Sequence, residues 1–119
     1  MTEVLTKLIS EISPIITIGD DWVSSDTEFP YCNYSYTEGE TEQRSDMQLT
    51  LDIWDRGTSV APVEELAKDI RVKIDRKIFI LDNKLVWIYF NTMQTIRDDD
   101  ERIKRRRQLY DIFIYDKED

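Results

Sequence analysis

Apolar residues recur every three or four positions in two segments of the chain, a spacing that places them on one face of a helix. The first segment runs from Thr2 to about Ile12. Thr2 can cap this helix, and Pro14 ends it because the residue before a proline is pushed out of the helical conformation. The second segment begins with Pro62 at its first position and runs to about Lys77. The sequence therefore predicts two amphipathic helices.

Apolar and polar residues alternate from Met47 to Ile53, as expected for a strand with one buried face. An aromatic-rich strand is predicted before it, from Tyr31 to Tyr36, and the polar segment from Thr37 to Ser45 is predicted to be a loop or hairpin tip. The elements predicted after the second helix are a short strand at 78–81, a turn at 82–84, a strand from 85 to about 96, a charged tip at 97–102 and a last strand at 104–116.

This pattern predicts one domain that covers residues 1–119. Its element order is α-β-β-α-β-β-β. Rules for layer packing then favour an α+β fold, with two helices packed on one face of a mainly antiparallel sheet.

The last two long strands are apolar on both faces. In the segments from Leu85 to Phe90 and from Leu109 to Tyr115, odd and even positions are alike large and apolar, whereas a half-exposed strand should alternate. Two helices cannot cover both faces, so we expect one face to be an exposed apolar surface that contacts other subunits. The alternative is that these strands are central and carry half-exposed aromatic residues near their ends.

The chain of 119 residues contains no histidine. Without histidine, the most common general base and metal ligand, neither a Ser-His nor a Cys-His pair can form. The 25 acidic residues are expected to be mainly solvated, and their spacing isolates no glycosidase-like pair. Cys32, the only cysteine, is expected to be a small, partly buried hydrophobic residue. We therefore expect a protein that is not an enzyme, with no catalytic residue, metal or cofactor.

A formal net charge of −9 argues against tight binding to nucleic acid, which depends on clustered Lys and Arg. The run from Lys104 to Arg107 is basic, but it begins a strand, so its side chains alternate between faces, and it follows the acidic run from Asp98 to Glu101. We expect Arg105 and Arg107 to form salt bridges with that acidic run or with a neighbouring subunit. The sequence contains no run of about 18 apolar residues, so we expect no membrane partner.

Several short motifs, in this order, resemble the tail-completion proteins of long-tailed bacteriophages, also called tail terminators or tail-to-head joining proteins. The motifs are Phe29-Pro30-Tyr31 before a strand, 51–56 closing the next strand, a helix over 63–74, Leu85-Val86-Trp87-Ile88, and the Asp98-Asp99 tip. The resemblance covers nearly the whole chain.

The resemblance implies a structural virion protein, made in the bacterial host cytoplasm and located in the neck, at the top of the tail. Proteins of this family form a hexameric ring that ends polymerisation of the tail tube and offers a surface to a head connector or stopper protein. DNA passes through the lumen of the ring without specific binding. The family has no catalytic residue. Six acidic copies would suit a lumen through which DNA slides, because no lattice of Lys and Arg would hold its phosphates.

Candidate functional residues follow from these expectations. Aromatic residues tend to dominate interfaces, and the candidate subunit contacts are Trp54, Trp87, Tyr89, Tyr110 and Tyr115. The candidate lumen or docking loops carry Glu38, Glu40 and Glu42 in one segment and Asp98, Asp99, Asp100 and Glu101 in another. Two alternative functions stay open: an acidic inhibitor that mimics DNA, and another neck protein such as a connector or stopper.

Overall fold

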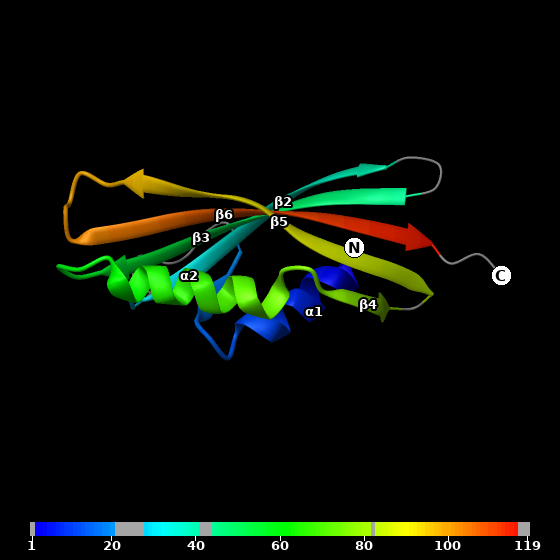
Figure 1. The fold of residues 1–119 in the computed structure, drawn as a ribbon, viewed down its shortest axis with the longest axis horizontal. Helices are drawn as coiled ribbons and strands as arrows, with labels where there is room; N and C mark the ends of the chain where they lie inside the picture. Colours follow the sequence, from blue (N-terminus) through cyan, green and yellow to red (C-terminus); the bar gives the residue numbers. More distant parts are fainter. Residues whose placement is uncertain (1, 21–27, 41–43, 82, 117–119) are drawn as a thin grey trace.

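The computed structural model describes residues 2–20, 28–40, 44–81 and 83–116 (Figure 1). These residues form two helices and one six-stranded sheet. The elements are α1 (Thr2–Ile12), β1 (Thr17–Gly19), β2 (Tyr31–Glu40), β3 (Arg44–Arg56), α2 (Ala61–Ile74), β4 (Ile78–Leu81), β5 (Lys84–Arg97) and β6 (Ile103–Asp116).

The sheet is mixed, with the strand order β1-β2-β3-β6-β5-β4. β1 pairs with β2 in parallel, and the other neighbouring strands pair antiparallel. The long strands twist strongly about one another, so the β2–β3 and β5–β6 hairpins reach opposite ends of an elongated molecule of 54 × 25 × 23 Å (Figure 1).

Both helices lie on the same side of the sheet, which we call the helix face (Figure 1). α2 packs against β3, β5 and β6, whereas the main contact of α1 is with α2. Ile70 and Ile74 of α2 are fully buried and belong to the same hydrophobic core as Ile53, Ile88 and Ile112 of the sheet. Burial of each such side chain contributes about 1.5–3 kcal/mol, so this layer holds the fold together.

The predicted fold class is wrong. Strands make up 55% of the described residues, the sheet is mixed, and α1 packs mainly on the other helix and not on the sheet. The observed order α-β-β-β-α-β-β-β adds β1, a three-residue edge strand too short to show a period of two. The segment predicted as a loop belongs partly to strands, because Glu38 of β2 pairs with Met47 of β3 and the ladder continues to Ser45.

The second helix ends earlier than the prediction near Lys77. Asp75 is extended, with ψ 136°, and Arg76 has a left-handed φ of 61°. The Asp75 carboxylate accepts a hydrogen bond from the backbone N–H of Phe90 at 2.8 Å, and the backbone N–H of Arg76 donates to the carbonyl of Ile88 at 2.8 Å. These bonds attach the end of α2 to β5, so the chain leaves the helix at Ile74.

Candidate assembly surface

The side of the sheet opposite the helices, the outer face, is not covered by any described helix or strand (Figure 1). Alternate residues of each strand point to it, and the pairing register places Asp46, Phe113 and Trp87 side by side on β3, β6 and β5. The apolar residues on both faces of the last two long strands predict an uncovered face of this kind.

An aromatic cluster occupies one end of the outer face. It consists of Trp87 and Tyr89 on β5 and Phe113 and Tyr115 on β6. The ring centroid of Trp87 lies 6.2 Å from Tyr89 and 6.3 Å from Tyr115, and that of Tyr89 lies 6.0 Å from Phe113. Tyr89 is 36% exposed and the other three rings are half-buried. Three of the five predicted anchors therefore lie together.

Arg44 of β3 extends the aromatic cluster. Its guanidinium lies 4.7 Å from the centre of the Phe113 ring and 5.9 Å from that of Tyr115, within the range of cation–π attraction. Arg44 also forms an ion pair with Asp46 at 2.6 Å. The cluster thus presents flat rings bordered by one charged pair, a composition common at protein interfaces.

Trp54, another predicted anchor, lies in a separate group at the far end of β3. Its ring stacks on Tyr31 at 5.9 Å, and its indole N–H donates to Asn33 Oδ1 at 2.7 Å. The guanidinium of Arg105 lies 4.3 Å from the Trp54 ring centre. Trp54 therefore does not join the aromatic cluster of β5 and β6.

Tyr110 is fully buried on the helix face. Its hydroxyl donates to Gln108 Oε1 at 3.0 Å, and burial raises the pKa of the phenol above its usual value. Its ring packs edge-on against Phe90 with centroids 5.6 Å apart. The structure places Tyr110 in the core, so it offers no surface to another subunit.

The basic run alternates between faces as its position on a strand requires. Arg105 and Arg107 turn to the outer face and both contact Asp52, with N–O distances of 3.2 and 2.9 Å. Arg106 turns to the helix face and pairs with Glu64 at 2.6 Å. The partner of Arg105 and Arg107 within the chain is thus Asp52 of β3 and not the acidic run that the sequence favoured.

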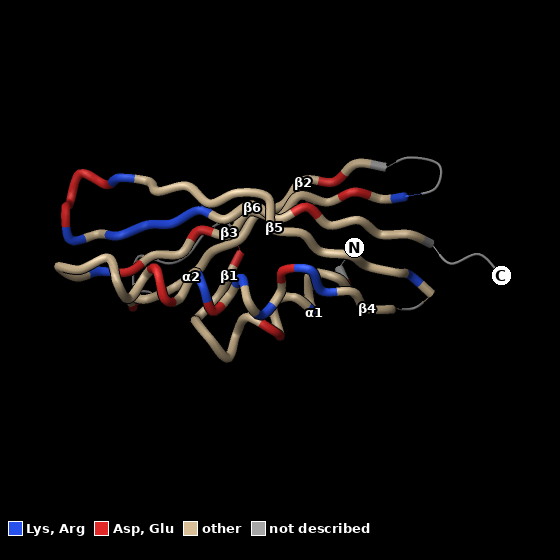
Figure 2. The backbone as a smooth tube through the Cα atoms, viewed as in Figure 1, with Lys and Arg blue, Asp and Glu red and all other residues tan. Residues whose placement is uncertain are grey.

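The acidic run from Asp98 to Glu101 forms the tip of the β5–β6 hairpin, next to the basic start of β6 (Figure 2). Asp100 accepts hydrogen bonds from the side chain and the backbone of Arg102, and these bonds lower the pKa of its carboxyl. Asp98 Oδ1 accepts from the N–H of Asp100 at 3.0 Å.

The second acidic segment lies on the other hairpin. Glu38 is exposed on β2, and Glu40 is the last residue of that strand. Glu42 lies outside the described residues. The two acidic segments therefore belong to hairpins at opposite ends of the molecule (Figure 1).

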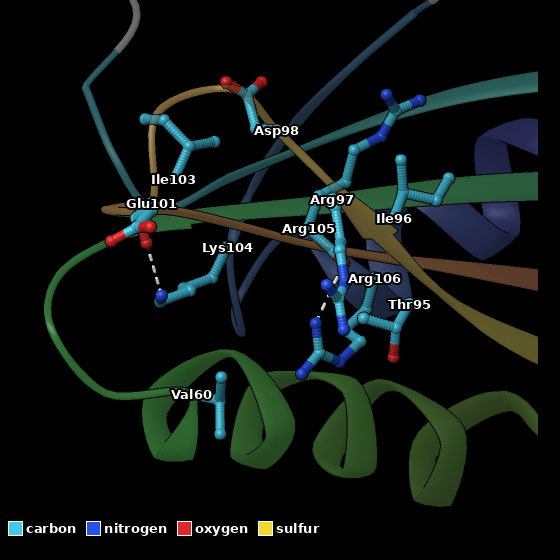
Figure 3. Close-up of a pocket in the computed structure, with 10 residues that line it drawn as sticks. All are labelled: Val60, Thr95, Ile96, Arg97, Asp98, Glu101, Ile103, Lys104, Arg105 and Arg106. Atoms are coloured by element: carbon cyan, nitrogen blue, oxygen red, sulfur yellow. Dashed lines mark hydrogen bonds between the residues drawn. The ribbon is translucent and has the colours of Figure 1, made fainter.

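Two grooves follow one another between α2 and the second half of β5. The larger, of about 350 Å³, lies between Val60 at the start of α2 and the β5–β6 hairpin, including Arg97 and Lys104 (Figure 3). The smaller, of about 170 Å³, is lined by Lys68 and Arg71 of α2 and by Phe90 and Met93 of β5, among others. Sequence reasoning missed both grooves, because they arise where α2 lies beside an incomplete edge of the sheet.

The state of Cys32 and the grouping of acidic side chains bear on nucleophilic chemistry and metal binding. Cys32 is fully buried, and burial raises the pKa of its thiol to about 12, so it is a poor nucleophile at neutral pH. Among the described residues, no three or more Cys, Asp or Glu side chains are grouped to hold a metal ion. Neither described helix has the length and apolar character needed to cross a membrane.

Comparison with known proteins shows similarity in fold. No protein-family model matches the chain, and no curated protein sequence matches it. A solved chain from the virion of a native gene transfer agent particle is similar to it, with a TM-score of 0.67 and 9% sequence identity. The match covers 91% of this chain and 84% of that chain. At this identity the match establishes a common fold for nearly the whole chain.

Proposed function

We propose that this protein is a structural component of a phage or phage-like virion, and that it forms a hexameric ring capping the head-proximal end of a tail tube. Its fold likeness to a chain of a gene transfer agent virion, over most of both chains, supports the virion role. The order of its sequence motifs, which resembles that of tail-completion proteins, supports the more specific role in the neck.

The uncovered aromatic cluster is the observation that carries the proposal. In the monomer, no described helix or strand covers the side of the sheet that carries Trp87, Tyr89, Phe113 and Tyr115. Large exposed apolar patches are uncommon on monomeric proteins and mark contact surfaces. Contact with a second protein or with another copy removes this area from water, which favours association. A ring with a tube protein on one side satisfies this requirement.

A ring of this kind would end tube growth by simple geometry. One side would dock on the last layer of tube protein, and the other would present a different surface, so that no further layer adds. That second surface would receive a head connector or stopper protein. With a formal net charge of −9 per copy, the ring would repel DNA phosphates and let DNA pass. This role requires no catalytic residue and no cofactor.

Imaging of the purified protein tests the proposal. We expect light scattering after size exclusion to give a mass about six times the 14.2 kDa of one chain, and negative-stain electron microscopy to show closed rings. If the rings assemble only when docked, mixing the protein with the tail tube protein of the same genome should give tubes capped at one end.

A protein that stays monomeric at all concentrations and leaves tube ends bare contradicts the proposed role. If this monomer instead inhibits a nuclease in competition with DNA, the acidic DNA-mimic alternative holds. Rings that bind a head connector but not a tube favour the stopper alternative. Nuclease inhibition and connector binding thus each select one of the two alternative functions.

A further inference from the structure

The larger groove, between the start of α2 and the β5–β6 hairpin, contains two cations without a carboxylate partner. Arg97 and Lys104 lie directly opposite each other on β5 and β6, so their side chains share one side of the sheet, and both line the groove. Figure 3 shows Lys104 on the side of the hairpin that faces α2. Neither residue forms an ion pair within the described residues, although Lys104 donates to the backbone carbonyl of Glu101.

The other charged residues of this groove leave those two cations available. Arg105 and Arg106 already pair with one carboxylate each, on β3 and on α2. Asp98 and Glu101 also line the groove, but both belong to the exposed hairpin tip, and Asp98 points away from α2 (Figure 3). The side of the groove that faces α2 therefore offers positive charge to an anionic ligand.

The size and lining of the groove suit a segment of protein better than a small ion. Its volume of about 350 Å³ is roughly ten times the ~30 Å³ that one water molecule occupies in the liquid. Val60, which is 46% exposed, borders it on α2, and the half-buried Ile96 and Ile103 line it on the hairpin. A fitting ligand therefore combines a carboxylate with the apolar stem of a side chain.

Nucleic acid is not the ligand that these charges favour. Duplex DNA carries one negative charge per roughly 1.7 Å of its axis, so it would bring several phosphates against the acidic tip at 98–101, which borders the groove. A protein strand brings far fewer charges, because its alternate side chains lie about 7 Å apart. One or two carboxylates match the two available cations, so the groove favours an acidic segment of protein.

A second copy of the chain supplies such a segment. Glu38 is exposed near the end of β2 and has no ion pair in the part of the chain that the structure describes. Glu40 ends the same strand two residues later. The β2–β3 hairpin that carries both residues projects from the opposite end of the molecule to the β5–β6 hairpin and its groove (Figure 2). The acidic hairpin of one copy is thus placed to meet the groove of the next.

We propose that the groove beside Arg97 and Lys104 holds the acidic end of the β2–β3 hairpin of a neighbouring copy, with the Glu38 carboxylate against the two cations. The contact joins different surfaces of the two copies, head to tail, which is the kind of contact that closes into a ring. Opposite charges across it would fix which end of each copy meets the next. This inference rests on the proposed ring.

A zero-length cross-link tests the contact in the full wild-type chain. A carbodiimide joins a carboxylate to an amine only where the two groups touch. Glu38 and Lys104 belong to hairpins at opposite ends of a molecule 54 Å long, so a Glu38–Lys104 cross-link found by mass spectrometry must join two copies (Figure 1). We expect this cross-link in the assembled protein. Lys104→Arg keeps the charge but removes the amine, so it should form rings without the cross-link.

Charge exchange tests the same contact by assembly. Glu38→Lys in one variant, and Arg97→Glu with Lys104→Glu in another, should each weaken association by about 10-fold or more, because like charges then meet. A 1:1 mixture of the two variants should regain rings, since each hairpin then finds a groove of opposite charge. Glu65→Lys makes the same charge change at an exposed residue of α2 outside both grooves and should assemble like the wild type. Thermal melting checks that every variant folds.

The outcomes separate this contact from the proposed function. Wild-type rings without the Glu38–Lys104 cross-link, together with intact rings in both reversed variants, overturn the contact and leave the proposed function standing. If the reversed groove loses only binding to a tube or connector protein while rings survive, the acidic ligand belongs to that other protein and the contact between copies is wrong. A wild type that gives the cross-link in open chains but never a ring keeps the contact and contradicts the ring. A wild type with neither overturns both.

Discussion

Asp52 is the residue that organises the charged end of the outer face. It is only 6% exposed, and it contacts Arg105 and Arg107 on the neighbouring strand. The register places Asp52 directly opposite Arg107, and Arg105 in turn covers the ring of Trp54. A single carboxylate therefore contacts two guanidinium groups and offsets part of their charge, and one of the two covers the aromatic ring beside it.

Substitution of Asp52 by Asn should destabilise the protein. The amide retains the size of the side chain but leaves Arg105 and Arg107 close together without a counter-charge, so we expect the free energy of unfolding to fall by about 2 kcal/mol. Urea denaturation monitored by tryptophan fluorescence measures the change. Asp69→Asn removes the same charge at an exposed site of α2 and should have little effect. Equal losses in the two variants would contradict this role.

The partners of the basic run show what residue-level reasoning could and could not predict. Its alternation between faces followed from the period of a strand, and the structure has Arg106 on the opposite side from Arg105 and Arg107. The partner Asp52 could not be identified, because pairing with β3 depends on a register set by residues distant in the sequence.

At the scale of elements, ion pairs connect α1 to the rest of the molecule. Glu11 near the end of α1 contacts Lys73 of α2 at 3.4 Å and Lys77 at 3.2 Å, and Lys7 one turn earlier at 3.3 Å. Hydrogen bonds from Lys77, then Lys7, lower the pKa of Glu11 to about 2. Since α1 contacts mainly α2, these pairs add to the apolar contacts of that helix.

The low pKa of Glu11 predicts how its contribution depends on pH. A carboxyl whose folded pKa lies below its unfolded value stabilises the fold above the unfolded pKa, here about 4.5, and loses that contribution as the pH falls toward 2. We expect Glu11→Gln to lower the melting temperature at pH 7, and the difference from the wild type to shrink between pH 4.5 and 2. Glu65→Gln, exposed on α2, is the control. A difference independent of pH would contradict the assignment.

The strands show why the fold was only partly predictable. Alternation from Met47 to Ile53 identified β3 correctly, because one side of that strand is buried by α2. The polar residues of β2 after Tyr36 lack this signal, since the hairpin there is held by backbone pairing more than by a core. In β5 and β6 both faces are apolar, so the sequence could not tell that Tyr110 lies under the helices while Trp87 does not.

In the molecule as a whole, the two faces of the sheet differ in composition and in what covers them. The helix face supplies the core, and the outer face of the same strands carries aromatic rings that no described element covers. The two hairpins project in opposite directions from the centre of the elongated molecule (Figure 1). Stability of the monomer and assembly of the proposed ring should therefore respond to different substitutions.

Tyr89→Glu tests that separation. Tyr89 is 36% exposed at the centre of the aromatic cluster, so a carboxylate there is solvated in the monomer but would be buried without a partner in a contact. We expect ring assembly, or binding to tube ends, to weaken by about 30-fold or more, the loss typical of an interface hot spot. The melting temperature of the monomer should change little. Val72→Glu places the same charge on α2 at a residue that is 76% exposed, and rings should survive it. If both variants assemble like the wild type in titrations followed by light scattering, the aromatic cluster is not a contact surface.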